Sequence, residues 1–284
     1  TSGLESLDTR EQEIWKAGIR AGNLYINRST TGAIVLRQPF GGMGKSALGP
    51  GLKAGSIEYV SQFMQITETD PPLMKPLTSE HRLFVITQEW RRLLRWGAWP
   101  AYRKELEQTI RAVTSYLHSM ETYYGTTQDY FHLRGQENQL RWLPVKDLVI
   151  RLHPDDSLFN MLARCAAALI AGCTPALSLP PGLTNLVSGF LTEQQAHRFL
   201  HGVSLVTETD EQLAERISNL ERLRYGGPDR VPVAVYTAAA RTGTWIARSP
   251  VCMEGRFELL HYLRQQAICN NYHRYGNLGE RAID

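Results

Sequence analysis

The chain has 284 residues, of which 43% are hydrophobic and 21% charged, and no apolar run is long enough to cross a bilayer. The formal net charge is only +3 and the basic residues are dispersed, which argues against a nucleic-acid-binding protein. Four cysteines in this length do not make a disulfide framework. Composition therefore predicts a globular, cytoplasmic protein of about two domains.

The first elements in the chain are a predicted helix and a predicted strand. Apolar residues recur at helical spacing over residues 5–21, so a helix is expected to begin after Ser2 or Ser6. The short apolar run Leu24-Tyr25-Ile26 that follows has strand propensity, and a polar turn comes after it.

A glycine-rich loop follows this strand. Consecutive backbone N–H groups beside Gly32 can point at one place and form a nest that suits a carboxylate. The alternative is an ordinary glycine-rich surface loop. Glycine disfavours a packed helix and suits close approach of the backbone to a ligand. The loop has seven glycines: Gly32, Gly41, Gly42, Gly44, Gly49, Gly51 and Gly55.

The order of residues in this loop is more specific than its glycine content. Residues 27–33 read Asn-Arg-Ser-Thr-Thr-Gly-Ala, and residues 38–42 read Gln-Pro-Phe-Gly-Gly. This order resembles the 1-pyrroline-5-carboxylate (glutamate semialdehyde) dehydrogenases of the aldehyde dehydrogenase superfamily. In many bacteria these enzymes are fused to proline dehydrogenase as proline utilisation A (PutA).

The resemblance implies NAD-dependent oxidation of glutamate semialdehyde to glutamate. It implies that the backbone N–H groups of Gly32 and Ala33 hold the α-carboxylate of the substrate, while the ring of Phe40 packs on its aliphatic part. Many members of the family have Ser at the position of Ala33, so a hydroxyl contact is absent here and the backbone contacts are the ones expected.

The catalytic parts of such an enzyme are not found in this sequence. The family uses a cysteine thiolate, a glutamate base and an NAD-binding fold half that all precede the glycine-rich loop. No G-x-G-x-x-G motif is present, and none of the four cysteines has the context of the family's nucleophile. We therefore expect no catalytic, cofactor-binding or metal-binding residue in this chain.

Several expectations follow from the lack of these catalytic parts. We interpret the chain, which begins at Thr1, as the C-terminal piece of a longer enzyme, inactive by itself, with NAD bound mainly by an upstream part. FAD is expected only if a proline dehydrogenase module lies upstream, and peripheral membrane association only through such a module. By resemblance, an alternating segment over residues 59–66 is an edge strand used in subunit pairing, which predicts a homo-oligomer.

A helical zone comes next. Pro71-Pro72 marks a linker, and residues 79–124 have helical periodicity. Aromatic and apolar residues between Trp90 and Trp99 predict an aromatic knot before Pro100. Nucleic-acid binding is the alternative for six basic residues of these helices, although a solvated helix face is the ordinary case; they are Arg91, Arg92, Arg95, Arg103, Lys104 and Arg111.

The last zone alternates strands and helices. A strand at 148–150, a helix at 157–171 with N-cap Ser157 and C-terminal Gly172, and a strand at 174–179 predict a parallel, doubly wound sheet. Residues 166–181 resemble the opening of an aldehyde dehydrogenase dinucleotide fold, but Ser178-Leu179-Pro180 stands where the family has a ribose-contacting Lys. By resemblance to long PutA proteins, this zone is a degenerate, non-catalytic domain.

Further elements are expected as a strand at 203–206, a helix at 210–222, a strand at 231–236 and a helix at 256–268. Residues 270–279 resemble the C-terminal signature of long PutA proteins, which the family uses as a lid. His197 and His201 share one face of a helix and could bind a metal, but a solvated face is favoured because no further ligand stands at matching spacing.

The predicted fold is thus α/β in three zones: an aldehyde dehydrogenase remnant (1–68), a helical linker (69–135) and a degenerate Rossmann-like domain with a C-terminal lid (136–284). Two functions are left open. The chain is either part of the dehydrogenase, with substrate-binding residues Gly32, Ala33 and Phe40, or a non-catalytic module for oligomerisation or for sealing a substrate channel.

Overall fold

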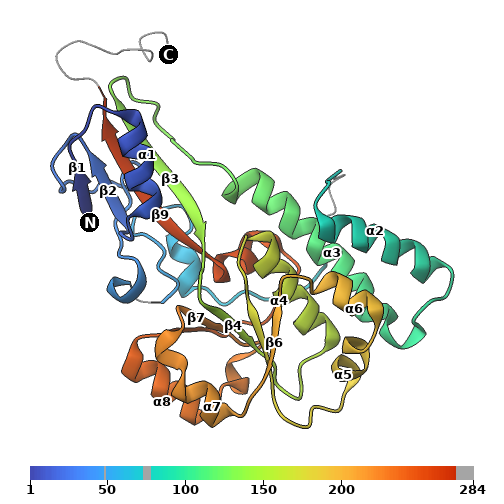
Figure 1. The fold of residues 1–284 in the computed structure, drawn as a ribbon. Helices are drawn as coiled ribbons and strands as arrows, with labels where there is room; N and C mark the ends of the chain where they lie inside the picture. The colour runs from blue at the N-terminus through green and yellow to red at the C-terminus, as the bar shows by residue number, and fades with distance from the viewer. Residues whose placement is uncertain (48, 73–77, 273–284) are drawn as a thin grey trace. The chain divides into compact units, whose positions relative to one another are not determined.

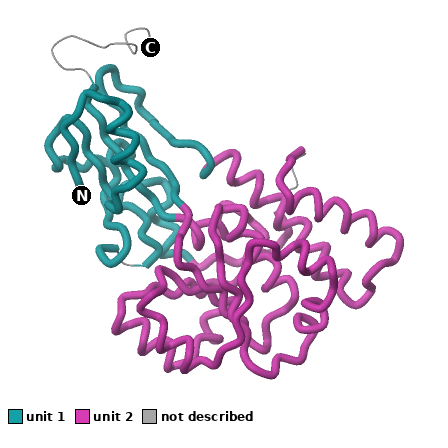
Figure 2. The backbone as a smooth tube through the Cα atoms, in the orientation of Figure 1, with its two compact units in different colours: residues 1–64, 124–143, 264–284 teal, residues 65–123, 144–263 magenta. Residues whose placement is uncertain are grey.

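The computed structural model describes residues 1–47, 49–72 and 78–272, and its α/β class with parallel sheets confirms the predicted fold class (Figure 1). The contacts divide the chain into two compact units (Figure 2). Unit 1 comprises residues 1–64, 124–143 and 264–284, and unit 2 comprises residues 65–123 and 144–263. Each unit therefore combines segments that are far apart in the sequence, across the three predicted zones.

Unit 1 is built on a four-stranded sheet in the order β1-β2-β9-β3. Its strands are β1 Ser2–Leu4, β2 Asn23–Ile26, β9 Leu263–Asn271 and β3 Gln136–Pro144. β2 runs parallel to both β1 and β9, and all four of its residues are buried. Continuous burial is typical of a strand that is covered on both faces, so the predicted strand at Leu24-Tyr25-Ile26 is confirmed as an inner strand.

The helix α1, Thr9–Gly18, confirms the first predicted helix but begins later than expected. Asp8 is its N-cap, with a carboxylate oxygen 2.9 Å from the backbone N–H of Arg10, so the helix begins where an acidic side chain can satisfy an unpaired donor. Next to it in unit 1 a small apolar cluster holds the sheet; its members are Trp15, Ile19, Ala21, Leu24, Ile26 and Ile268.

The segment at 59–66 is not a strand, and that prediction is wrong. It contains the 3₁₀ helix Tyr59–Phe63, whose first turn is closed by a bond from Ser61 N–H to Glu58 O at 3.0 Å and whose last turn is closed by one from Met64 N–H to Ser61 O at 3.2 Å. An alternating sequence becomes a strand only where a neighbouring strand accepts its backbone hydrogen bonds. Here local i to i+3 bonds satisfy the backbone instead.

The helix predicted at 256–268 is also wrong. This stretch contains the short helix α9 Gly255–Glu258 and the 3₁₀ turn Leu259–His261, and then enters β9. β9 is buried at every residue but its last and pairs with β2 from Ala267 to Asn270. Pairing with a strand from the other end of the sequence thus overrides the local helical periodicity. The C-terminal signature at 270–279 lies outside the described residues after Tyr272.

Unit 2 contains a five-stranded parallel sheet in the order β6-β5-β4-β7-β8. Its strands are β4 Leu148–Arg151, β5 Ala176–Leu179, β6 Ser204–Thr207, β7 Arg222–Arg224 and β8 Trp245–Ala247. The first strand of the unit, β4, lies at the centre, and the direction of winding reverses between β4 and β7. This confirms the predicted doubly wound parallel sheet.

The helix α4, Leu158–Ile170, follows the central strand of this sheet. Its N-cap is Ser157, whose hydroxyl accepts from the Asn160 N–H at 3.1 Å, and Gly172 follows the helix in the left-handed region at φ 82°. Both ends agree with the sequence. Almost all of α4 is buried, which explains its nearly continuous apolar sequence.

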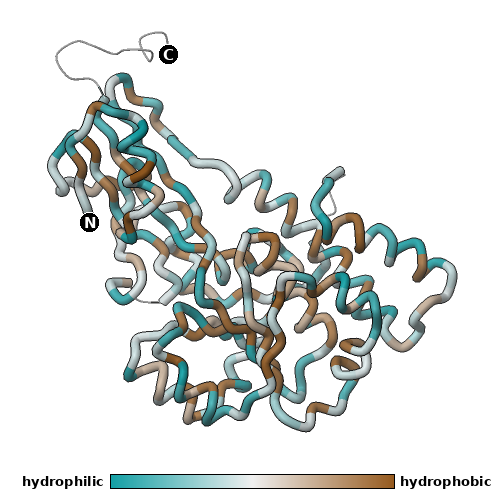
Figure 3. The backbone as a smooth tube through the Cα atoms, viewed as in Figure 1, coloured by the Kyte–Doolittle hydropathy of each residue, from teal (hydrophilic) through white to brown (hydrophobic). Residues whose placement is uncertain are grey.

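Helices α2, Arg82–Arg95, and α3, Arg103–Ser119, belong to unit 2, with a 3₁₀ turn at Pro100–Tyr102 before α3 and a π-helical turn at Met120–Tyr124 after it. The first turns of α2 contain the hydrophobic run 83–86, and its later turns mix hydrophilic and hydrophobic residues (Figure 3). The indole of Trp90 is fully buried and stacks on Phe199, with ring centroids 4.8 Å apart. Trp96, at 84% exposed, does not join the predicted aromatic knot.

The remaining helices of unit 2 are α5 Leu186–Leu191, α6 Gln194–Phe199, α7 Asp210–Glu215 and α8 Val233–Thr242. The helix predicted at 210–222 is therefore too long, because a 3₁₀ turn and β7 use its second half. The strand predicted at 231–236 is wrong, since α8 begins there after Pro232. Among the described residues, no helix combines the length and the hydrophobicity that a membrane span requires.

Candidate functional site

The predicted carboxylate-binding loop follows β2 in unit 1. Asn27, at φ 56°, turns the chain away from the strand, and Gly32 has φ 94°, which favours glycine. Gly32 and Ala33 are both exposed. Within the described part of the chain, neither of their backbone N–H groups donates to a protein acceptor. These two donors are therefore available to an anion from outside the chain.

Arg28 holds this loop in its conformation. Its guanidinium donates to the carbonyl oxygen of Thr31 at 2.8 Å and to the sulfur of Cys269 on β9 at 3.0 Å. One of its terminal nitrogens lies 3.2 Å from where a Cβ on Gly32 would be. The two free N–H donors thus lie beside a permanent positive charge. The sequence predicted the two donors but not this role of Arg28, because the partner Cys269 is remote in sequence. The only signal for Arg28 in the sequence is its place next to Asn27, just before the loop.

Phe40 presents its ring to solvent from a fixed backbone. Its N–H donates to Ala54 O at 3.0 Å, and Ala54 N–H donates back to Phe40 O at 2.9 Å. A second pair of backbone bonds, at 3.2 and 2.7 Å, joins Ile34 to Gln38. The ring is 53% exposed, which leaves it free to cover an aliphatic ligand.

A buried polar network supports the loop from below. The side-chain amide of Gln38, 1% exposed, donates to Asn138 at 3.1 Å and to the sulfur of Cys269 at 3.0 Å. Asn23 donates to Pro39 O at 2.9 Å and accepts from Gly41 N–H at 3.1 Å. Since these partners come from β2, β3 and β9, the sheet of unit 1 sets the position of the loop.

Comparison with known proteins shows what the chain is similar to. Residues 1–69 match the model of the aldehyde dehydrogenase family. "Bifunctional protein PutA" of Rhizobium meliloti is 49% identical over 53 residues, 19% of this chain and 4% of that protein. "1-Pyrroline-5-carboxylate dehydrogenase" of Bacillus thuringiensis is 50% identical over 52 residues, 18% of this chain and 10% of that protein.

A solved structure of PutA from Corynebacterium freiburgense matches a larger part. It has a TM-score of 0.63 and 29% identity, and the match covers 96% of this chain and 23% of that one. The resemblance to aldehyde dehydrogenases and PutA is confirmed. PutA of Klebsiella aerogenes is 28% identical over 163 residues, 54% of this chain. The chain spans about a tenth of that relative, 11% of its length.

Lys53 is a fully buried side chain of the loop region that follows β2. Its ammonium donates to Gly41 O at 2.5 Å, and its backbone N–H donates to the side chain of Gln265 at 2.7 Å. Burial lowers the pKa of Lys53 from 10.5 to about 7. Between about pH 7 and pH 10, Lys53 is therefore mostly neutral in the folded unit, while it is still protonated in the unfolded chain.

This shift predicts a pH dependence of stability. Between pH 7 and about 10 the unfolded chain binds the proton of Lys53 more tightly than the folded chain does, so the free energy of unfolding should rise with pH, by at most about 5 kcal/mol. Urea denaturation across this range should give a slope that Lys53→Met removes. The exposed Lys45→Met is the matched control; an identical slope in Lys53→Met would contradict the prediction.

The four cysteines are all free and buried. Burial raises the pKa of Cys165 and of Cys252 to about 12, and it also raises the pKa of Cys269 against the effect of Arg28. A nucleophilic cysteine needs an accessible thiolate. These thiols are therefore poor candidates for attack on an aldehyde.

Ion pairs fill the carboxyl edge of the sheet in unit 2. Arg151 at the end of β4 donates to Ser178 Oγ at 3.0 Å and to Asp210 at 2.8 Å. Ser178 donates to Glu208 at 2.6 Å, and Glu208 also accepts from Arg216 at 2.7 Å. Ser178, the first residue of the stretch Ser178-Leu179-Pro180, is therefore held by structural partners.

A buried carboxylate lies just before α4. Asp156 accepts from His153 N–H at 2.9 Å and from Arg164 at 2.6 Å, and it also pairs with Arg230. Burial opposes ionisation of Asp156, but the two guanidinium groups outweigh it and the pKa lies below its ordinary value. Residues 152–157 contain no glycine. This edge therefore does not fit the diphosphate of NAD, which needs close backbone approach and no competing anion.

The two histidines considered for a metal do not share a helix face. α6 ends at Phe199, so His197 lies on the helix and His201 lies beyond it. Among the described residues, no group of three or more His, Cys, Asp or Glu side chains is arranged to hold a metal ion.

Proposed function

We propose that this chain supplies the carboxylate-anchoring loop of an NAD-dependent dehydrogenase that oxidises L-glutamate γ-semialdehyde to glutamate, in a PutA-type enzyme of proline catabolism. The observation on which the proposal depends is the pair of unused N–H groups at Gly32 and Ala33 beside the guanidinium of Arg28. The names of the relatives support an aldehyde-oxidising role and this substrate.

The chemistry of the loop suits one end of this substrate. The α-carboxylate would accept from both N–H groups, and the charge of Arg28 would strengthen those bonds. The ring of Phe40 would cover the methylene groups between the carboxylate and the aldehyde. This anchoring presents the aldehyde, at the far end, to a cysteine and a bound NAD that other parts of the enzyme supply. We expect the 284 residues alone to be inactive.

Phe40→Ala in the complete enzyme tests this role. Loss of the ring should raise KM for glutamate semialdehyde about 5- to 12-fold, because about 1–1.5 kcal/mol of apolar contact is lost. KM for propanal, which has no carboxylate to position it against the ring, should change little. Steady-state kinetics with both aldehydes measure the difference.

Val35→Ala is the control, since Val35 is an apolar residue of the same loop and is 69% exposed. It should leave both KM values near those of the parent enzyme. Unchanged kinetics in Phe40→Ala, or an equal change for propanal, would count against the anchoring role.

A second role concerns unit 2, which we propose to be non-catalytic. The supporting observation is that polar side chains at the edge where a dinucleotide would bind are already bonded within the unit. Arg151 donates to Ser178, Ser178 donates to Glu208, and Asp156 accepts from Arg164. A module of this kind contributes through its surfaces, by sealing a channel or by assembly. For residues 272–284, which belong to unit 1, the same non-catalytic role predicts that their removal alters leakage of the intermediate or oligomer size without changing NAD affinity.

A further inference from the structure

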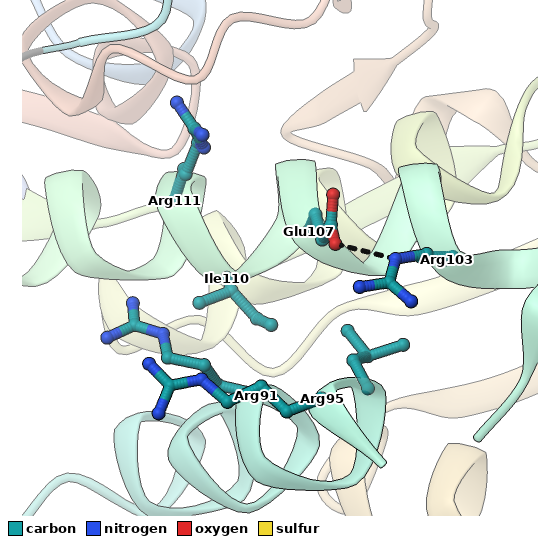
Figure 4. A pocket seen from close by; sticks show the side chains of 7 residues that line it. Arg91, Arg95, Arg103, Glu107, Ile110 and Arg111 are labelled. Carbon is teal, nitrogen blue, oxygen red and sulfur yellow. Dashed lines mark hydrogen bonds and ion pairs between the residues drawn. The ribbon is translucent and has the colours of Figure 1, made fainter. Parts of the chain in front are cut away.

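Helices α2 and α3 of unit 2 enclose a groove that the proposed function does not use (Figure 4). Its volume is about 460 Å³, within the range of small-molecule sites. Leu94 and Ile110 also line it, but both are almost fully buried and expose little surface. The other lining residues are charged: Arg91, Arg95, Arg103, Glu107 and Arg111.

The groove has more positive than negative side chains. Glu107 pairs with Arg103 at 3.1 Å, while Arg91, Arg95 and Arg111 have no ion pair or hydrogen bond with any described residue. Several other arginines of unit 2 are ion-paired. An Asp or Glu oxygen lies within 4.0 Å of six of them, namely Arg151, Arg164, Arg198, Arg216, Arg224 and Arg230.

Two of the unpaired arginines are placed to bind two adjacent anionic groups. Arg91 and Arg95 are four residues apart on α2 and share one face, with about 5–6 Å between their Cβ atoms. Figure 4 shows both side chains extending in the same direction below Ile110. Two neighbouring guanidinium groups repel each other, and adjacent phosphates that each accept a forked pair of bonds would remove that cost.

We propose that this groove binds a small molecule that contains a diphosphate group, with Arg91 and Arg95 as its phosphate ligands. A nucleic acid is the less suitable occupant. The groove is short, and the chain as a whole balances 31 basic residues against 28 acidic ones. The proposal is independent of the anchoring loop in unit 1.

Calorimetric titration of the full-length protein with inorganic pyrophosphate tests the site. Replacing both arginines by serine (R91S/R95S) should weaken binding at least about tenfold. R91K/R95K keeps the charge but loses the forked geometry, so its affinity for pyrophosphate should lie between those of the parent protein and of R91S/R95S. Arg92→Ser is the matched control, because Arg92 is exposed on the same helix and does not line the groove. Binding at any other phosphate site is common to all variants and cancels in the comparison.

A selective loss in R91S/R95S, with circular dichroism unchanged, supports the proposal. Absence of binding, equal affinity in all variants, or an equal loss in Arg92→Ser would overturn it. Tighter binding of a short single-stranded oligonucleotide than of pyrophosphate, lost in the same double variant, would also overturn it, since the groove would then be part of a nucleic-acid surface.

Discussion

Replacing Glu258 by glutamine is expected to lower the free energy of unfolding of unit 2 by about 3–5 kcal/mol. Glu258 and Arg224 are both fully buried, and two nitrogens of the guanidinium donate to the carboxylate at 2.8 to 3.2 Å. The same carboxylate accepts from Tyr262 OH at 2.7 Å and from Cys252 N–H at 3.0 Å. Removing its charge leaves an unpaired guanidinium inside the protein, which is the costly outcome for a buried ion pair.

Urea denaturation followed by tryptophan fluorescence measures this loss. The exposed pair Arg103–Glu107 provides the control, since both side chains are about half exposed at 52% and 51%. Glu107→Gln should cost less than about 1 kcal/mol, because water screens exposed pairs. A loss below about 1 kcal/mol in Glu258→Gln would show that water reaches Arg224 and that the pair is not buried as described.

Gly32→Val in the complete enzyme is expected to raise KM for glutamate semialdehyde about 5- to 150-fold. A β-branched residue is strained by about 1–3 kcal/mol at φ 94°, and its side chain would meet the Arg28 guanidinium 3.2 Å from the Cβ. Relief of that strain would turn the two N–H groups away from a common point. Steady-state kinetics with the semialdehyde and with propanal measure the effect, and only the semialdehyde should respond.

Gly44→Val separates backbone strain from anchoring. Gly44 also has a positive φ, of 61°, and open space where its Cβ would lie, but it is outside the anchoring residues. Its substitution should leave KM unchanged even if stability falls. An equal rise of KM in both variants, or for both aldehydes, would assign the effect to general distortion of unit 1 and reject the anchoring loop.

The sequence alone determined the features that depend on local chemistry. Ser157 and Gly172 bound α4 as expected, because a hydroxyl cap and a left-handed glycine act within one helical turn. The strand-helix-strand alternation around α4 predicted the parallel sheet of unit 2. The order Asn-Arg-Ser-Thr-Thr-Gly-Ala indicated the resemblance to aldehyde dehydrogenases.

Only the tertiary structure decided the features that depend on distant partners. β9 has a helical pattern in sequence, yet it is a strand because β2 and β3 accept its backbone bonds. Residues 59–66 alternate like a strand, yet form a 3₁₀ helix where no strand pairs with them within the described chain. The contact of Arg28 with Cys269 follows from the same sheet pairing. Strand pairing is a property of two segments together, and the periodicity of either one cannot specify it.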